Sequence, residues 1–447
     1  TKHNLGIGFM NSLTADNFST RIENGEETQV LTEPMTNYNV LVFDQRFNRT
    51  SSVSLVNTNV LRKGGSRDAN VTALLGSFYT KSGNHLLEVS GNQSAIFEGD
   101  SIETGYRSSA RLADVGGHWR WAGQAEFKTD DYNPNDLGFQ RRNNAIFYQG
   151  EVGYRTTKPV GPFNKFSHDI VAWYQFLFKP YRYEETVISY NGFFLLRNFF
   201  AFGMNAAMTP NDVYNYYEPR EWGRWFRGPA QRSVGGFISS DYRRKVALDA
   251  NGTFFWWNRL GKQETTFRLR PRFRFGDHFF ALPIFKIVDA NNDYGYVPDN
   301  DPTQVHFGRR NTLTIENSID AQYVFTPKTS LTLVLRHTYT DVDYRDFYIL
   351  ENDGYLTPTA LAGVNDLNFN AFNIDLKYSW WFAPGSELVI LYRQAVAAAD
   401  NTVGQSYYQN LDGTFDSPVQ NNISVRFTYF LDYNRTRNYF RNRRTEI

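Results

Sequence analysis

The chain has 447 residues, of which 47 are basic and 46 acidic, so its formal net charge is only +1. A balance this even gives no overall attraction to nucleic acid. The absence of cysteine excludes disulfide scaffolds, cysteine-ligated metals and thiol nucleophiles. Aromatic residues reach 17% although the mean hydropathy is -0.52. No apolar run approaches the roughly 18 residues that a transmembrane helix needs.

Apolar and polar residues alternate along most of the chain, which is the pattern of β-strands. We find no convincing helical period. In chain order the alternating runs cover 3–13, 36–47, 50–61, 69–80, 84–92, 101–112, 116–129, 144–157, 167–179, 185–197, 199–209, 232–244, 247–258, 264–275, 278–289, 310–325, 330–343, 367–382, 386–399 and 420–433. They predict about 20 strands, or roughly 16 to 22 if runs are merged or split, and single-chain bacterial barrels have even numbers.

The two sides of these strands differ in chemistry. In the last run, Ile423, Val425 and Phe427 lie on one side, whereas Ser424 and Arg426 lie on the other. An arginine that faced lipid at mid-bilayer would cost about 2–4 kcal/mol, so the charged side must face a lumen. The fold class is therefore predicted to be all-β, a single large antiparallel transmembrane β-barrel of the outer membrane. A large β-sandwich or propeller shares the alternation but would carry less charge at inward positions.

The connections between the runs support the same topology. Short turns such as 81–83, 326–328 and 383–385 alternate with long loops, which cover 14–35, 130–143, 210–231, 290–309, 344–366 and 400–419. Short turns face the periplasm and long loops face outside, so both chain ends are predicted to be periplasmic. The barrel is predicted to span 1–434, followed by a basic periplasmic tail at 435–447. The start has no signal peptide, so we expect a mature or truncated form.

Several segments resemble a known family. They are Leu5–Asn11, Thr32–Val40, Ser52–Val60, Asn135–Phe139, and Tyr217–Arg220 ahead of Gly223 and Arg224. Together they resemble a family of outer-membrane barrels of unknown function from the Bacteroidota. Longer members carry an N-terminal carbohydrate-binding family-9-like domain, which is not seen here. The resemblance implies a barrel with some link to carbohydrate and more sequence before Thr1, but it implies no catalytic residue.

The run 264–275 carries a ladder of four arginines, Arg268, Arg270, Arg272 and Arg274. An electropositive track for anions is one interpretation. The other is salt bridging inside the lumen, because Asp249, Glu316 and Asp320 are predicted to project inward from nearby strands. The sequence leaves both open and makes these side chains candidates for the pore lining.

The loop 210–231 is the strongest candidate for a ligand or partner surface. It combines aromatic and charged residues, among them Tyr217, Arg220, Trp222, Arg224 and Trp225. Aromatic rings beside arginine could stack on sugars, but the same composition suits a loop that packs on itself and constricts the pore. We expect the loop to be ordered, with both tryptophans packed and its arginines meeting carboxylates.

A weak calcium site is predicted where Asp289, Asn291 and Asp293 place oxygen ligands at relative positions 1, 3 and 5. The glycine comes one residue late and position 12 is Asn300 instead of Glu, so a turn rich in Asp and Asn is the alternative. No other cofactor is expected. Catalysis has little support, because no HExxH or GxSxG motif occurs and the pair Asp277–His278 is most simply an accidental neighbourhood.

Three functions remain for such a chain. The first is a non-enzymatic channel or uptake barrel for glycan or other nutrient fragments. The second is an accessory or structural subunit of a larger outer-membrane complex, with its lumen plugged by loops. The third is an outer-membrane hydrolase. The expected partners are outer-membrane lipid and lipopolysaccharide, and an outer-membrane or periplasmic protein, but no nucleic acid.

Overall fold

The structure is a computed structural model that describes residues 4–23, 26–65, 67–298, 303–361 and 366–430. The predicted basic tail at 435–447 and the end of the last predicted strand, 431–433, lie outside these residues. The chain divides into two compact units. Unit 1 comprises 1–161, 165–192 and 207–215, and unit 2 comprises 162–164, 193–206 and 216–447.

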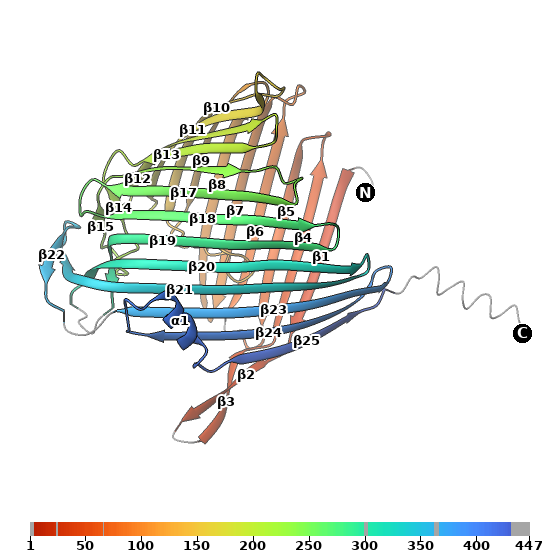
Figure 1. The fold of residues 1–447 in the computed structure, drawn as a ribbon. Coiled ribbons are helices and arrows are strands. Elements are labelled where there is room, and N and C mark those ends of the chain that lie inside the picture. Colours follow the sequence, from red (N-terminus) through yellow and green to blue (C-terminus); the bar gives the residue numbers. More distant parts are fainter. Residues whose placement is uncertain (1–3, 24–25, 66, 299–302, 362–365, 431–447) are drawn as a thin grey trace, which may run out of the picture. The chain divides into compact units, whose positions relative to one another are not determined.

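Unit 1 is built from long antiparallel strands that pair with their neighbours in sequence (Figure 1). The ladder runs β1 (Leu5–Thr14), β4 (Thr36–Arg46), β5 (Ser52–Arg62), β6 (Asp68–Tyr79), β7 (His85–Glu98), β8 (Ser101–Asp114), β9 (Trp119–Lys128), β10 (Ala145–Arg155) and β11 (Phe163–Leu177). A separate hairpin of β2 (Asn17–Glu23) and β3 (Glu26–Glu33) connects β1 to β4.

Unit 2 repeats this arrangement with longer strands. Its ladder runs β16 (Gln231–Ser239), β17 (Val246–Trp257), β18 (Gln263–Phe275), β19 (Phe279–Val297), β20 (His306–Thr326), β21 (Thr329–Leu350), β23 (Leu367–Ala383), β24 (Ser386–Asp400) and β25 (Gln420–Thr428). The short β22 (Leu356–Thr359) pairs with the end of β21. The remaining elements are β12 (Arg182–Leu196), β13 (Ala201–Met208), β14 (Val213–Asn215), β15 (Phe226–Gly228) and the helix α1 (Tyr407–Thr414).

The predicted number of strands is confirmed, because the antiparallel ladders of the two units contain nine long strands each, and β12 and β13 bring the total among the described residues to 20. Three predicted loops were wrong in part. Residues 14–35 contain the β2–β3 hairpin, and 290–309 and 344–366 contain the ends of strands of 19 to 22 residues. The pairing of these strand ends with each other extends the ladders further than the apolar alternation indicated.

The absence of helix was also predicted wrongly, since α1 forms within the loop 400–419. Its start carries a capping box in which the Ser406 hydroxyl accepts from the Gln409 backbone while the Gln409 side chain accepts from the Ser406 backbone. This reciprocal pattern stabilises a short helix. Within the described part of the chain, no helix has the length and apolar content needed to cross a membrane.

Each unit has one charged face and one apolar face. In unit 1, Arg107 pairs with Glu126 at 2.7 Å and Arg111 with Glu88 at 3.2 Å. In unit 2, the corresponding ion pairs include Lys286–Glu316 at 2.8 Å and Arg393–Asp375 at 2.6 Å. Successive side chains of a strand point to opposite faces. The opposite, apolar face carries large exposed side chains, among them Trp119, Trp121, Phe127, Phe267, Ile423, Val425 and Phe427.

Candidate functional site

The four predicted arginines of β18 lie on the charged face of unit 2, but they have different partners. Arg270 forms an ion pair with Asp249 on β17 at 3.0 Å. Arg272 lies over the rings of Tyr242 and Phe280, with its guanidinium carbon 4.3 Å and 5.7 Å from the ring centres. Arg274 pairs with the exposed Asp277 at 3.5 Å. Among the described residues, Arg268 has no carboxylate partner and lies between Asn251 and Lys286 in register.

The three predicted acidic residues lie on the charged face, as expected, but only one of them pairs with the arginine ladder. Asp249 meets the ladder, whereas Glu316 pairs with Lys286 of β19 instead of an arginine. Asp320 lies on β20 without an ion pair to any described residue. The ladder therefore contains two ion pairs, one cation held by aromatic rings and one cation without a carboxylate partner among the described residues, and only one of its ion pairs uses a carboxylate that the sequence suggested.

A cavity of about 800 Å³ opens beside this ladder within unit 2. Its apolar wall includes Phe193 and Phe237, whose rings stack with centres 6.1 Å apart, and Leu195. Its polar wall includes the amides of Asn205 and Asn251. Neither amide makes a side-chain hydrogen bond within the described residues, so both offer donors and acceptors to a bound molecule.

Charged groups hold the rim of the cavity in place. The Asp249 carboxylate accepts hydrogen bonds from Ser239 at 2.7 Å, Tyr242 at 2.6 Å and Arg270 at 3.0 Å. In the turn after β16, the Arg243 guanidinium binds Asp241 and lies 3.8 Å above the centre of the Phe199 ring. Hydrogen bonds from Arg243 lower the pKa of Asp241 to about 2. Asp241 on this rim therefore stays ionised throughout the physiological pH range.

The second half of the predicted ligand loop, residues 216–231, is ordered on the ends of β19–β22. Phe226 packs on Phe307, with ring centres 5.0 Å apart, beside a buried cluster of Val305, Phe307 and Leu350. The Glu218 carboxylate accepts a hydrogen bond from the Tyr296 backbone at 3.0 Å. This segment has its own apolar core, as the self-packing interpretation requires.

The expected contacts of individual loop residues need correction. Trp225 packs against Gly354 and the ring of Tyr216, but Trp222 is 80% exposed at a turn. Arg220 lies over the Tyr296 ring and Arg224 donates to the Leu350 carbonyl. Neither of these two arginines meets a carboxylate among the described residues. Tyr217 lies half-buried at the start of the turn, where its carbonyl accepts from the Arg220 backbone at 3.2 Å.

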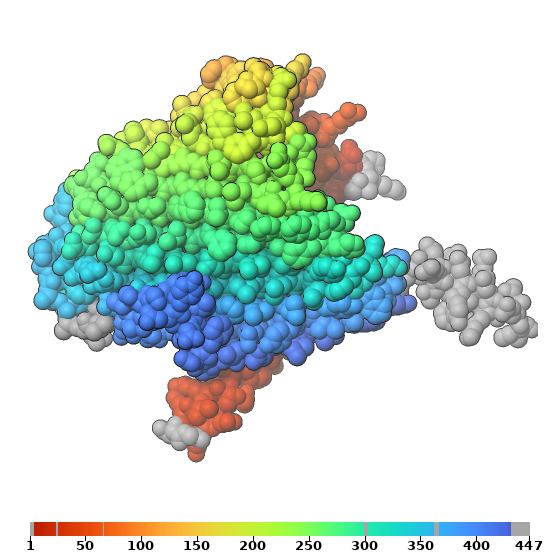
Figure 2. Space-filling model, in the orientation of Figure 1, coloured from red at the N-terminus to blue at the C-terminus, as the bar shows by residue number. Residues whose placement is uncertain are grey.

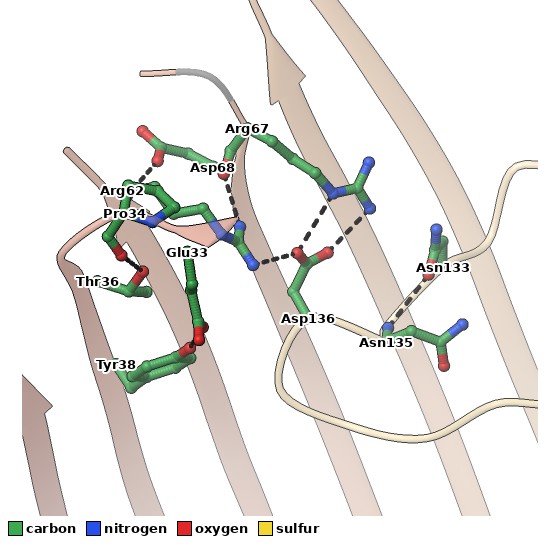
Figure 3. Close-up of polar contacts among 10 residues, drawn as sticks. All are labelled: Glu33, Pro34, Thr36, Tyr38, Arg62, Arg67, Asp68, Asn133, Asn135 and Asp136. Carbon is green, nitrogen blue, oxygen red and sulfur yellow. Dashed lines mark hydrogen bonds and ion pairs between the residues drawn. The ribbon is translucent and has the colours of Figure 1, made fainter. Parts of the chain in front are cut away.

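A further polar cluster in unit 1 involves two of the segments that resemble the known family, Thr32–Val40 and Asn135–Phe139 (Figure 3). Asp136, in the segment Asn135–Phe139, accepts hydrogen bonds from Arg62 at 2.9 Å and from Arg67 at 3.3 and 3.1 Å. Arg62 ends β5 and is paired in register with Thr36 of β4. The Asp136 side chain is only 7% exposed, so removing it would leave two arginines without their shared anion.

The same loop, 130–143, is seated on the charged face of unit 1. The Asn133 backbone donates to the buried Ser94 hydroxyl of β7 at 3.0 Å. The loop backbone at Asp131 and Tyr132 comes so close to Gly105 of β8 that a Cβ there would lie 2.2 Å from the Tyr132 nitrogen. Burial raises the pKa of Tyr132. The two-arginine clasp on Asp136 therefore holds a loop folded inward over the strands.

The predicted calcium ligands lie on β19 at a bulge between Ala290 and Asp293. The Asp293 carboxylate is bound by two cations, Lys262 at 2.6 Å and Arg310 at 3.0 Å. The Asn291 amide donates to Asp289 at 3.2 Å. Calcium would have to displace both cations from Asp293, and the described residues contain no group of three His, Asp or Glu side chains arranged for a metal. A calcium role stays a prediction.

Sequence comparison places the chain in a family. The profile described as "Domain of unknown function (DUF5916)" matches residues 1–440. The chain belongs to the DUF5916 family. The match covers all the segments on which the resemblance rested, whereas the source in the Bacteroidota and the carbohydrate-binding domain of longer members stay predictions. No protein with a curated description matches this DUF5916 chain.

Solved structures that are similar to this chain include those of a copper transporter and a siderophore receptor. The copper transporter OprC is similar with a TM-score of 0.55 and 10% identity, over 96% of the DUF5916 chain and 73% of OprC. The siderophore receptor PirA from Pseudomonas aeruginosa gives a TM-score of 0.49 and 9% identity, over 96% and 81% of the two chains. At such low identity the likeness to OprC concerns the fold alone, and it confirms the predicted class of large antiparallel barrel proteins.

Proposed function

We propose that this chain is a non-enzymatic barrel of the bacterial outer membrane that takes up small polar nutrient fragments, with glycan fragments as the first class to test. The apolar faces would contact membrane lipid and lipopolysaccharide, and the charged faces would line the path. Support for the location comes from the fold and from the separation of the two faces. Support for uptake comes from the cavity beside the arginine ladder.

The main support for uptake is the chemistry of the side chains that line this cavity. The rings of Phe193 and Phe237 offer a flat apolar surface, and the amides of Asn205 and Asn251 offer hydrogen bonds that no described residue uses. Binding sites for small molecules combine a mostly apolar wall with a few placed polar groups. Neutral sugars present an apolar ring face and hydroxyl groups, so they match both walls without requiring a charge.

Replacing Asn251 by Leu tests this function. We expect the variant to bind neutral oligosaccharides about 5- to 10-fold more weakly, because one buried polar contact contributes about 1 kcal/mol. Binding is measured by calorimetry on the purified barrel, and uptake by the swelling of liposomes that contain it. Gln322→Leu is the matched control, since Gln322 is an exposed amide on β20 and does not line the cavity.

Equal losses of oligosaccharide affinity in Asn251→Leu and Gln322→Leu would contradict a binding role for the cavity. The same conclusion would follow if the native chain bound no neutral or anionic oligosaccharide. If anions bind and neutral sugars do not, the ladder of Arg268 to Arg274 becomes the relevant surface. Replacement of Arg268 and Arg272 by Gln then lowers anion selectivity in planar bilayers.

The inward-folded loop 130–143 supports a second candidate function. The loop 130–143 lies on the charged face of unit 1, clasped by Arg62 and Arg67. A loop held this way favours an accessory or structural subunit whose lumen is plugged. Conductance separates the two functions, since a steady open level supports uptake and silence supports a plugged subunit. In the plugged case, Asp136→Ala should release the loop and produce conductance.

A further inference from the structure

Asparagines form a ladder across four neighbouring strands of unit 1. Asn11 of β1 is paired in register with Asn39 of β4, Asn39 with Asn59 of β5, and Asn59 with Asn70 of β6. Asn37, Asn57, Thr72 and Gln93 lie on the same face in adjacent rows. These residues are called the asparagine ladder below. All eight are uncharged and carry groups that donate and accept hydrogen bonds.

The asparagine ladder lies on the apolar face. Register pairs Ser94 with Val71, and Val71 with Thr58, so these three share the charged face on which the loop 130–143 is seated. Their strand neighbours Asn70 and Asn59 point the other way. Along the strands, exposed apolar side chains flank the ladder on both sides: Phe9, Leu55 and Leu74 on one side and Leu13 and Leu61 on the other.

Hydrogen bonds within the asparagine ladder use only some of its side-chain donors and acceptors. The Asn11 amide donates to Asn37 at 2.6 Å and to Asn39 at 2.7 Å, and the Asn57 amide donates to Asn70 at 3.0 Å and to Thr72 at 2.8 Å. Asn59 makes no side-chain hydrogen bond among the described residues. An amide left without partners in an apolar medium costs about 2–7 kcal/mol. Asn39, Asn70 and Thr72 also donate within the ladder. Lipid chains cannot supply partners to Asn59, so the ladder requires a polar cover there.

We propose that the asparagine ladder is the contact surface between two copies of this chain in the membrane. Amides are complementary to themselves, because each one both donates and accepts, and a two-fold dimer brings the same patch of each copy together. The absence of charge disfavours lipid phosphate as the cover. The flanking leucines place the ladder inside the apolar band, where hydrogen-bonding side chains serve as contacts between membrane proteins.

The inference rests on the membrane location proposed above, but not on uptake. The chain has no cysteine, so single replacements give unambiguous cross-links. We would place Asn39→Cys, Asn59→Cys and Asn70→Cys one at a time in the full chain, oxidise the protein in native-like bilayers, and compare them with Val152→Cys. Val152 lies on the apolar face of β10 and is 44% exposed, so it is a matched lipid-facing control.

At least one ladder position should give a band at twice the 51.8 kDa of the chain, about 10-fold stronger than the control. Single-molecule photobleaching of the labelled native chain should show two steps, and the double variant Asn39→Leu, Asn59→Leu should shift most molecules to one step. One-step bleaching of the native chain, equal cross-linking at Val152, or cross-links only to a protein of another mass would overturn the proposal. Liposome swelling on the same samples separates the two ideas, since a dimer without uptake contradicts only the proposed function.

Discussion

Two regions of the molecule carry amides on an apolar face, and they differ in what covers them. In unit 2, Asn317, His337, Asn368 and Asn370 lie on the apolar face of β20, β21 and β23, opposite the charged neighbours Glu316 and Asp375. The helix α1 covers this patch, and Figure 2 shows it as a raised blue mass on the strands. In unit 1, the asparagine ladder has no such cover among the described residues.

The covered patch is closed by specific hydrogen bonds. Tyr407 of α1 accepts from the Asn317 amide at 2.8 Å and contacts the His337 ring nitrogen at 2.9 Å. Asn410 of α1 accepts from the Asn368 amide at 2.5 Å. His337, Asn368 and Asn410 are all at most 3% exposed. The comparison teaches that this chain can bury amides on its apolar face with its own loop, and under the proposal above a second copy plays that part for the asparagine ladder.

The largest effect is expected from Asn410→Leu, which removes one of the two acceptors of the buried Asn368 amide and leaves only the Thr402 carbonyl. We expect the free energy of unfolding to fall by about 2–4 kcal/mol, because a buried donor loses a partner and a larger side chain enters a packed site. Urea unfolding of the reconstituted barrel measures it. Asn401→Leu is the matched control in the same loop, since Asn401 is exposed, and its effect should stay within about 0.5 kcal/mol. Equal effects would mean that α1 is not a cover.

An intermediate effect is expected from Tyr407→Phe, which removes one hydroxyl and leaves the ring. The amide of Asn317 and the ring nitrogen of His337 then lose a shared partner, so we expect a loss of about 1–3 kcal/mol in unfolding free energy. Tyr408→Phe controls for the chemistry, because Tyr408 is 79% exposed beside it. Should both variants unfold at the same urea concentration, the hydroxyl of Tyr407 would not stabilise the patch.

The smallest effect on the single chain is expected at the asparagine ladder. The double variant Asn39→Leu, Asn59→Leu should not lower the unfolding free energy of the monomer, because the hydrogen bonds lost at Asn39 are offset when the unpaired Asn59 amide no longer faces lipid. Unfolding measured at high dilution in lipid isolates the monomer. A loss as large as that of Asn410→Leu would show that the ladder is an internal structural element like the α1 patch, and the comparison would fail.

Much of the fold was predictable because period-two alternation reports directly on strands with two different faces. The strand number and the separation of charged from apolar side chains followed from residues such as Arg270 beside Leu269. The helix α1 was missed although the sequence contains its signal, Ser406 followed three residues later by Gln409. The capping motif alone did not predict a helix, because the eight residues of α1 are too few to show a sustained helical spacing of apolar side chains.

The candidate sites were less predictable. The inward position of Asp249, which pairs with Arg270, followed from strand alternation. Glu316 instead forms an ion pair with Lys286, because the register of β19 and β20 places Glu316 and Lys286 opposite each other. The clasp on Asp136 joins residues 69 and 74 positions apart in sequence, and no local pattern reports such a pairing. Trp222 and Trp225 look alike in sequence, yet one is exposed and one packed because a turn lies between them.

The sequence alone determined the class of fold, the approximate number of strands and the face to which each strand turns its charges, because these depend on the order of neighbouring residues. Only the tertiary structure decided which side chains meet across strands, because register sets those pairs. It also showed that Asn11, Asn39, Asn59 and Asn70 form one row, whereas in sequence they are four separate exceptions to an apolar pattern. A polar residue on an apolar face becomes interpretable only when its neighbours on the other strands are known.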